Sequence, residues 1–224
     1  MRSALFVAVA VLLCYVSLAA DLQPCNIDDF KAAQNDFADA LQISDDDDWH
    51  HPLELLEAIH NYYGNNSVEG LLNVCNAYNK MLNDLKNKNI DAATCFDPFW
   101  LLKSDDTPDD AVNFAGVSGY LRYQCGAGFY AVASRWDSVA KVYKTKTPDL
   151  VKILRDTLRD ARTDTKNRCT IIEDQKYNYR KIFQDGTADY QISYFGCQSA
   201  NWLFANIYGE CNNNCDLHAP QPSV

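Results

Sequence analysis

The residues that could carry chemistry are few and widely spaced along the chain. Four histidines occur, at His50, His51, His60 and His218. A Gly-x-Ser-x-Gly elbow, a His-Glu-x-x-His pair, a phosphate-binding loop and a dinucleotide glycine pattern are all missing, and Gly116-Val117-Ser118-Gly119 is one residue short of the elbow. We therefore expect a protein that is not an enzyme, with no catalytic residues and no cofactor.

The best candidate for metal binding is the acidic run 45–48, which is followed by His50 and His51. Clustered carboxylates attract hard cations, but an EF-hand loop needs alternating ligands, a central glycine and a closing glutamate, which do not follow here. Glu57-Ala58-Ile59-His60 matches half of a di-iron motif, and no second Glu-x-x-His occurs. The sequence predicts a solvated acidic loop, no metal site, and a surface or interhelical position for His60.

The chain is rich in aromatic side chains, with 13 Tyr, 10 Phe and 4 Trp. Trp100, Trp136 and Trp202 fall on the apolar faces of their segments, which indicates a packed core, although aromatic side chains could also line a cavity for an apolar ligand. Trp49 differs because it stands beside the acidic run. An exposed tryptophan in a flexible loop is a reasonable anchor for a protein partner.

The first 20 residues have the pattern of a secretory signal peptide. Arg2 is followed by an uncharged apolar run from Ala4 to Ala20, which ends in small residues before Asp21. We therefore expect residues 1–20 to be removed and the protein to be secreted to the extracellular space. No second apolar run follows, so the sequence predicts a soluble mature protein without a membrane span.

Removal of this leader would remove one of the nine cysteines, Cys14. An even number of cysteines in a secreted chain is typical of a disulfide framework, most simply four bridges, whose connectivity the sequence does not fix. Zinc is the alternative, but only Cys211 and Cys215 have a spacing that suits a zinc knuckle. The predicted disulfide cysteines are Cys25, Cys75, Cys95, Cys125, Cys169, Cys197, Cys211 and Cys215.

Asn65-Asn66-Ser67 is the sole acceptor sequence for an N-linked glycan. It falls in a predicted turn after Gly64, where a glycosyltransferase could reach it. We therefore expect Asn65 to be glycosylated.

The chain is acidic, with 20 basic and 30 acidic residues and a net charge of −10. Removal of Arg2 with the leader would leave 19 basic residues against 30 acidic ones, a net charge of −11. Such a charge argues against nucleic acid and anionic membranes as partners.

Hydrophobic residues recur at helical spacing along the whole mature chain. We expect helices near 27–41, 52–64, 67–85, 107–125, 129–139, 147–161, 165–186 and 197–211. Thr107-Pro108 and Thr147-Pro148 each have the form of a helix start, with a hydroxyl cap and proline at the first position. The predicted fold is a single all-α domain over residues 21–215, a disulfide-stapled bundle of about seven or eight helices, followed by a disordered tail at 216–224.

The closing segment constrains the disulfides. On one unbroken helix, Cys197 and Cys211 would share a face about 21 Å apart, too far to bond each other. We expect them to tie the last helix to two different neighbours. Cys215 could attach the helix end to a third neighbour, or pair with Cys211 if the helix has ended at Gly209.

The leader, the eight spaced cysteines and the closing Phe195-Gly196-Cys197 and Cys211-x3-Cys215 pattern resemble nematode secreted cysteine-rich families. The nearest are the chondroitin-proteoglycan-4-type domain and an eight-cysteine domain family of unknown function. Ser118-Gly119 is the sole Ser-Gly pair and lacks flanking acids, so we expect no glycosaminoglycan chain. The resemblance implies a secreted helical protein, and an excretory–secretory role towards host or tissue proteins.

Two functional hypotheses follow. The first is a secreted, non-enzymatic extracellular binding protein that acts on other proteins. The alternative is a carrier of a small apolar ligand, such as a fatty acid or a retinoid, in a helical cavity.

Overall fold

The computed structural model describes residues 22–44, 46–104, 107–211 and 214–215. The expected leader at 1–20 and the expected tail at 216–224 lie outside the described residues. Within the described ranges the chain is helical, and its β pairing is an isolated bridge between Gln23 and Ile90. The helices are α2 (Ile27–Leu41), α3 (Pro52–Asn87), α4 (Ala92–Cys95), α5 (Pro98–Leu102), α6 (Pro108–Gln124), α7 (Ala127–Val132), the 3-10 turn η1 (Ala133–Arg135), α8 (Trp136–Thr163), α9 (Arg168–Thr187) and α10 (Tyr190–Ile207).

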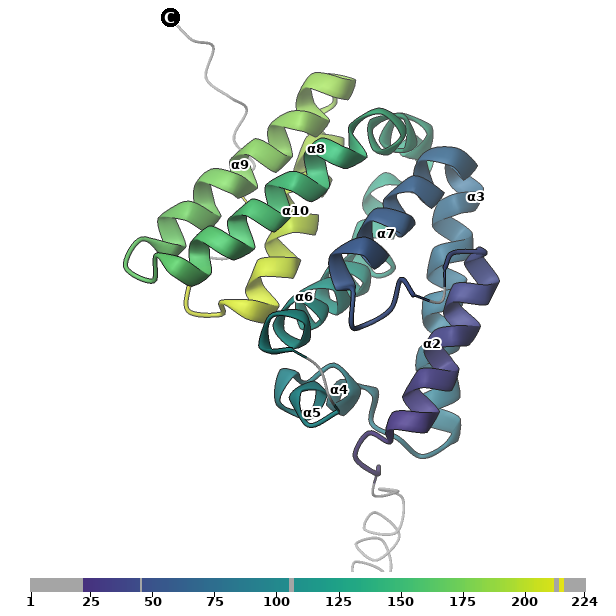
Figure 1. Cartoon of the computed structure of the whole chain (residues 1–224). Helices are drawn as coiled ribbons and strands as arrows, with labels where there is room; N and C mark the ends of the chain where they lie inside the picture. The colour runs from purple at the N-terminus through teal and green to yellow at the C-terminus, as the bar shows by residue number, and fades with distance from the viewer. Residues whose placement is uncertain (1–21, 45, 105–106, 212–213, 216–224) are drawn as a thin grey trace, which may run out of the picture.

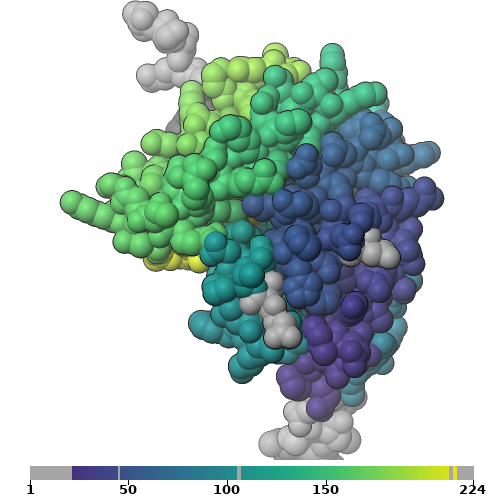
Figure 2. Space-filling view, viewed as in Figure 1, coloured from purple at the N-terminus to yellow at the C-terminus, as the bar shows by residue number. Residues whose placement is uncertain are grey.

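The helices pack as one bundle, which confirms the predicted all-α, disulfide-stapled fold (Figure 1). The long helix α3 packs against α2 on one side and against α8 on the other. Helices α8, α9 and α10 lie together, and α6 joins this group to α3 through contacts with both α10 and α3. On the face shown in Figure 2, the side chains of the N-terminal helices lie directly against those of the α8–α9 pair. The short helices α4 and α5 lie beside the start of α6 (Figure 1).

Side-chain caps lie at the starts of several helices. The Asn26 side chain accepts hydrogen bonds from the first backbone N–H groups of α2, and Thr107 caps α6 in the same way. Asp189 caps α10, which begins at Tyr190, so the predicted start of this helix near 197 is wrong. Such caps satisfy backbone donors that have no partner within the helix, so these boundaries are set by local sequence.

The predicted break between Gly64 and Ser67 is a kink inside α3. Ser67 has φ 52° and ψ −139°, and its hydroxyl donates a hydrogen bond to Asp137 at the start of α8. Gly64 lies so close to α8 that a Cβ added to it would stand 2.6 Å from the Lys144 Cα. The kink therefore occurs beside the closest approach of α3 and α8.

The prediction of a helix start at Thr147-Pro148 is wrong. Helix α8 runs without interruption from Trp136 to Thr163, with Pro148 inside it. The Thr147 hydroxyl donates to the Tyr143 carbonyl at 2.6 Å instead of capping a new helix. The buried apolar face of α8 continues on both sides of the proline, so packing outweighs the local break signal.

The aromatic side chains fill the interior, in agreement with the core interpretation. The largest fully buried aromatic residues are Phe30, Tyr63, Tyr120, Trp136, Tyr143, Tyr179, Phe183, Phe195 and Phe204. Trp49 belongs to this core as well, because it is 3% exposed and its ring centroid lies 5.0 Å from that of Phe30. The prediction of an exposed Trp49 anchor is therefore wrong, since the ring packs against Phe30 of α2. In the predicted helix 67–85, the apolar residues Val68 and Leu72 are exposed.

All eight predicted cysteines form disulfides. The pairs are Cys25–Cys95, Cys75–Cys125, Cys169–Cys211 and Cys197–Cys215. Four disulfides are typical of proteins that fold in an oxidising compartment.

The closing segment differs from its prediction. Helix α10 ends at Ile207, so Cys211 lies beyond the helix and bonds Cys169 at the start of α9. Cys197 pairs with Cys215, which follows α10 in the chain, so this bridge does not tie α10 to a second neighbouring helix. The buried Lys176 supports the chain next to Cys215, since its ammonium donates to the Asn214 carbonyl at 3.2 Å.

Candidate functional site

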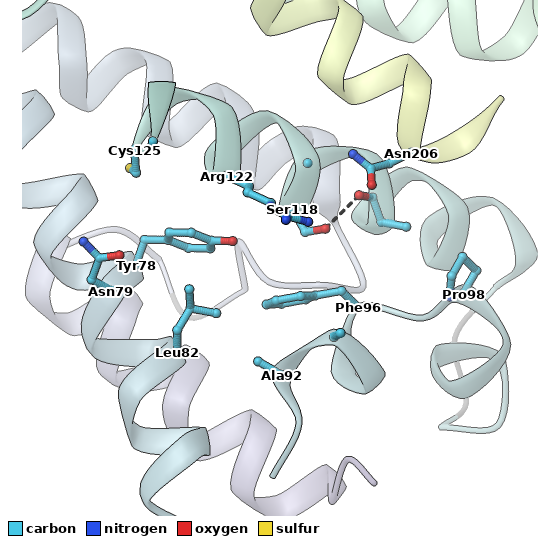
Figure 3. Close-up of a pocket in the computed structure, with 14 residues that line it drawn as sticks. Tyr78, Asn79, Leu82, Ala92, Phe96, Pro98, Ser118, Arg122, Cys125 and Asn206 are labelled. Carbon is cyan, nitrogen blue, oxygen red and sulfur yellow. Dashed lines mark hydrogen bonds between the residues drawn. The ribbon is translucent and has the colours of Figure 1, made fainter. Parts of the chain in front are cut away.

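An open pocket of about 540 Å³ lies between α3, α4, α6 and the end of α10. Figure 3 shows the side chains that surround it. Its apolar part is formed by Leu82 of α3, Ala92 of α4, Phe96 between α4 and α5, and Pro98 at the start of α5. Its polar part contains Asn79, Ser118, Arg122 and Asn206, with the hydroxyl end of Tyr78 directed between the two parts.

Two disulfides hold segments that form walls of this pocket. Cys75–Cys125 links α3 to the C-terminal end of α6, and Cys125 itself lines the pocket. Cys25–Cys95 attaches α4 to the segment before α2, which positions Phe96 directly after the bridge. The walls are therefore held in place by covalent bonds before any ligand arrives.

The floor of the pocket is closed. Beneath Tyr78 and Phe96, the remaining void among Phe37, Leu55, Met81 and Phe114 measures about 10 Å³. A void of that size holds a single water at most. A bound molecule would therefore lie in the surface pocket and would not enter the aromatic core.

Arg122 supplies the charge of the pocket. Among the described residues that line the pocket it is the only charged one, in a chain that carries 30 acidic residues. Its guanidinium lies 6.0 Å from the centre of the Trp202 ring. Within the described residues it makes neither an ion pair nor a side-chain hydrogen bond, so its donors are available to a ligand.

Tyr78 supplies a second donor. The residue is 4% exposed, and its hydroxyl makes no hydrogen bond to any described residue. Burial raises the pKa of Tyr78 to about 12, although the nearby Arg122 opposes this shift. The phenol is therefore protonated at physiological pH and presents an O–H group to the pocket.

A second group of polar side chains lies at the centre of the bundle. The Tyr120 hydroxyl is its hub, at 2.8 Å from His60 Nε2, 2.8 Å from the Tyr143 hydroxyl and 3.1 Å from the Tyr179 hydroxyl. Gln124 extends the group by donating to Tyr143 at 2.7 Å and to Ser199 at 3.2 Å. These residues come from α3, α6, α8, α9 and α10, so the network joins five helices.

This central network has no access to solvent, because His60, Tyr120, Tyr143 and Tyr179 are all fully buried. Burial lowers the pKa of His60 to about 3, so the imidazole is neutral. The position of His60 is interhelical, and the alternative of a surface residue is wrong. We interpret the network as a structural element, since no substrate could reach it.

The acidic segment before α3 shows no metal-binding geometry. His51 Nδ1 lies 3.0 Å from the Asp46 carbonyl oxygen, and Asp48 accepts from the backbone N–H of His50 at 2.8 Å. Across the described ranges, no group of three or more His, Cys, Asp or Glu side chains could hold a metal ion. Asp45 lies outside those ranges.

Asn65 is exposed on the last turn before the kink in α3. The predicted glycan acceptor is thus placed on the surface, although in a helix and not in a turn. Its glycosylation stays a prediction.

The pocket itself was not predicted from the sequence. Its residues come from four segments, and Tyr78 and Leu82 were assigned to an apolar stripe that faces the core. Arg122 gives no local signal, because its lack of an acidic partner becomes visible only when α6 is seated against α3 and α10.

Comparison with protein-family models, curated proteins and solved structures found no match. No helix within the described residues combines the length and the apolar composition that a membrane crossing requires. The function must therefore be inferred from the pocket and its chemistry.

Proposed function

We propose that this protein is a secreted, non-enzymatic binding protein that holds a small amphipathic molecule in the pocket between α3, α4 and α6. The observation that carries the proposal is the pocket of about 540 Å³, with an apolar part next to a few polar groups. Ligand sites in proteins typically measure roughly 300–1,000 Å³ and combine an apolar lining with a small number of polar contacts.

The disulfides support this function. A pocket whose walls are already fixed loses less conformational entropy when a ligand binds. Cys75–Cys125 and Cys25–Cys95 fix the two walls here. The same bridges, together with the leader-like N-terminus, favour secretion to an oxidising extracellular environment.

This proposal selects the second of the two functional hypotheses and changes its location. The hypothesis of a protein-directed factor rests on the leader, the disulfides and the missing catalytic motifs, and it loses one suggested anchor because Trp49 is buried under α2. The carrier hypothesis expected the ligand inside the helical core. Tyrosines and phenylalanines fill that core, so the surface pocket is the better site for a ligand.

Calorimetric titration with decanol, an uncharged amphiphile, tests the proposal. We expect the wild-type protein to bind decanol and Ser118→Trp to lose the binding, because the half-buried Ser118 faces the pocket (Figure 3) and an indole would fill it. Ala93→Trp, at an exposed position on the rim, is the second blocking variant for the case that Ser118→Trp does not fold. Leu72→Trp adds an indole on an exposed face outside the pocket and is the matched control. Equal binding by wild type and both blocking variants would contradict the proposal.

A further inference from the structure

The charge inside the pocket is opposite to the charge of the protein as a whole. The chain has a net charge of −10, yet the pocket lining contains Arg122 and no acidic side chain. Other surface arginines are paired, such as Arg155 with Glu54 at 3.3 Å and Arg168 with Glu210 at 2.9 Å. Arg122 has no such partner within the described residues, so an anion in the pocket would meet an uncompensated positive charge.

Tyr78 strengthens this preference. Its hydroxyl lies on an almost fully buried side chain, has no hydrogen-bond partner among the described residues, and is directed into the pocket between Arg122 and Phe96 (Figure 3). This oxygen is not one of the fully enclosed polar atoms that lack a partner, so a ligand can reach it from the pocket. Because the phenol is protonated, it can donate to an anion and complete a pair of donors with the guanidinium.

The polar side chains near Arg122 and Tyr78 do not form hydrogen bonds with these two donors. The Ser118 hydroxyl donates to the Ala115 carbonyl at 2.8 Å, and the Asn206 amide donates to the Trp202 carbonyl at 2.7 Å. Both groups are thus engaged with their own helices. Gly119 allows Asn206 to approach α6, since a Cβ at this position would overlap the Asn206 side chain.

The apolar half of the pocket determines the chemical nature of the rest of the ligand. Leu82, Ala92 and Phe96 lie across from Arg122, and Phe99, which follows the pocket residue Pro98, is 75% exposed. A short hydrocarbon chain would lie over Leu82 and Phe96 while its head group stays at Arg122. The closed floor keeps this chain along the surface.

We infer that the ligand of this pocket is an anionic amphiphile, with a carboxylate held by the Arg122 guanidinium and the Tyr78 hydroxyl and with an alkyl chain against Leu82 and Phe96. This inference rests on the proposed function, because it assigns a chemical class to the ligand of the same pocket. A planar guanidinium matches the two oxygens of a carboxylate, which makes Arg122 the main determinant of specificity.

The experiment compares decanoate with decanol, which share an alkyl chain and differ in the head group. We expect wild type to bind decanoate roughly tenfold to a hundredfold more tightly than decanol, the usual effect of hydrogen bonds to a charged group. Arg122→Gln should lower decanoate affinity by a similar factor and leave decanol affinity within about twofold. Tyr78→Phe should weaken decanoate binding by a smaller factor, since a neutral donor contributes less than a charged one. Added salt should weaken decanoate binding and leave decanol binding unchanged.

Two control variants separate charge from other effects. Arg122→Lys keeps the positive charge and should retain part of the preference for decanoate. If the substitutions at Arg122 acted only by removing its packing on Trp202, they would lower the affinity for decanoate and decanol alike. Arg155→Gln removes an exposed arginine outside the pocket and changes the net charge by the same amount, so it should leave both affinities unchanged. Arg122 is exposed, so its variants are not expected to unfold.

The outcomes distinguish the inference from the function on which it rests. Equal affinity for decanoate and decanol in wild type and in Arg122→Gln would overturn the anionic ligand and leave the amphiphile pocket in place. Failure of wild type to bind either compound would overturn the proposed function, and the inference with it.

Discussion

His60 Nε2 lies 2.8 Å from the Tyr120 hydroxyl at the centre of the bundle, where neither side chain is accessible to solvent. The pair joins α3 to α6, and the Tyr120 hydroxyl also forms hydrogen bonds with Tyr143 of α8 and Tyr179 of α9. A buried hydrogen-bond network favours one arrangement of its helices, although His60 Nδ1 and Gln124 Oε1 have no partner among the described residues. The neutral state of His60 is thus part of what holds the fold together.

The first prediction concerns the pH dependence of stability. Burial lowers the pKa of His60 from 6.5 to about 3, so between these values the unfolded chain binds a proton that the folded chain does not. The free energy of unfolding should therefore fall as the pH drops from about 6.5 towards 3, by up to about 1.4 kcal/mol per pH unit from this group. Above pH 6.5 the contribution is constant.

His60→Gln is the matched variant, because glutamine can keep a hydrogen bond to Tyr120 but does not titrate. Urea unfolding at a series of pH values should show a shallower decline for His60→Gln than for wild type. Identical pH profiles would mean that the imidazole is protonated equally in both states.

The second prediction concerns the contact between α3 and α8. A Cβ on Gly64 would stand 2.6 Å from the backbone of Lys144, so Gly64→Ala should force the two helices apart. We expect a loss of about 1–3 kcal/mol in the free energy of unfolding, the usual cost of overpacking. Gly209→Ala is the control, since its Cβ would meet only the Ala205 carbonyl at 3.6 Å. Equal stability of the two variants in urea would show that α3 and α8 are not in close contact.

The third prediction concerns the disulfides that hold the pocket. Cys75→Ala/Cys125→Ala opens a bridge of 50-residue separation, and we expect a loss of about 2–5 kcal/mol in stability. Decanol affinity should fall as well, because α3 and α6 form opposite walls of the pocket. Cys197→Ala/Cys215→Ala, which opens a bridge remote from the pocket lining, should lower stability without changing decanol affinity. If both double variants bound decanol as tightly as wild type, the Cys75–Cys125 bridge would not contribute to decanol binding.

The fourth prediction concerns the glycan. Asn65 is exposed, and the acceptor hydroxyl belongs to Ser67. Protein secreted from eukaryotic cells should lose mass on treatment with peptide N-glycosidase, and Asn65→Gln should abolish this change. Asn66→Gln leaves the acceptor sequence intact and should keep the glycan. An unchanged mass for treated wild type would refute the prediction.

Several features of this protein could be predicted from local sequence. The caps at Asn26 and Thr107 act on the backbone directly after them, so the starts of α2 and α6 follow from a few neighbouring residues. The helical spacing of apolar residues predicted an all-α fold, and the even number of cysteines after the leader predicted four disulfides.

Other features depended on contacts between distant segments. Thr147-Pro148 has every local mark of a helix start, yet the apolar face of α8 is buried on both sides of it and the helix continues. Trp49 has acidic neighbours, yet its ring packs against Phe30. In both cases the burial of apolar surface outweighs a weaker local preference.

The sequence by itself thus determined the helical character of the chain, the starts of α2 and α6 and the set of cysteines that form disulfides, because these depend on residues within a few positions of one another or on composition. The tertiary structure decided which cysteines pair, where His60 lies, and that Tyr78 and Arg122 share a pocket with Phe96. Those relationships arise from the packing of α3, α4 and α6 against one another. Packing is set by the fit of whole helix surfaces, which the order of residues along one segment does not reveal.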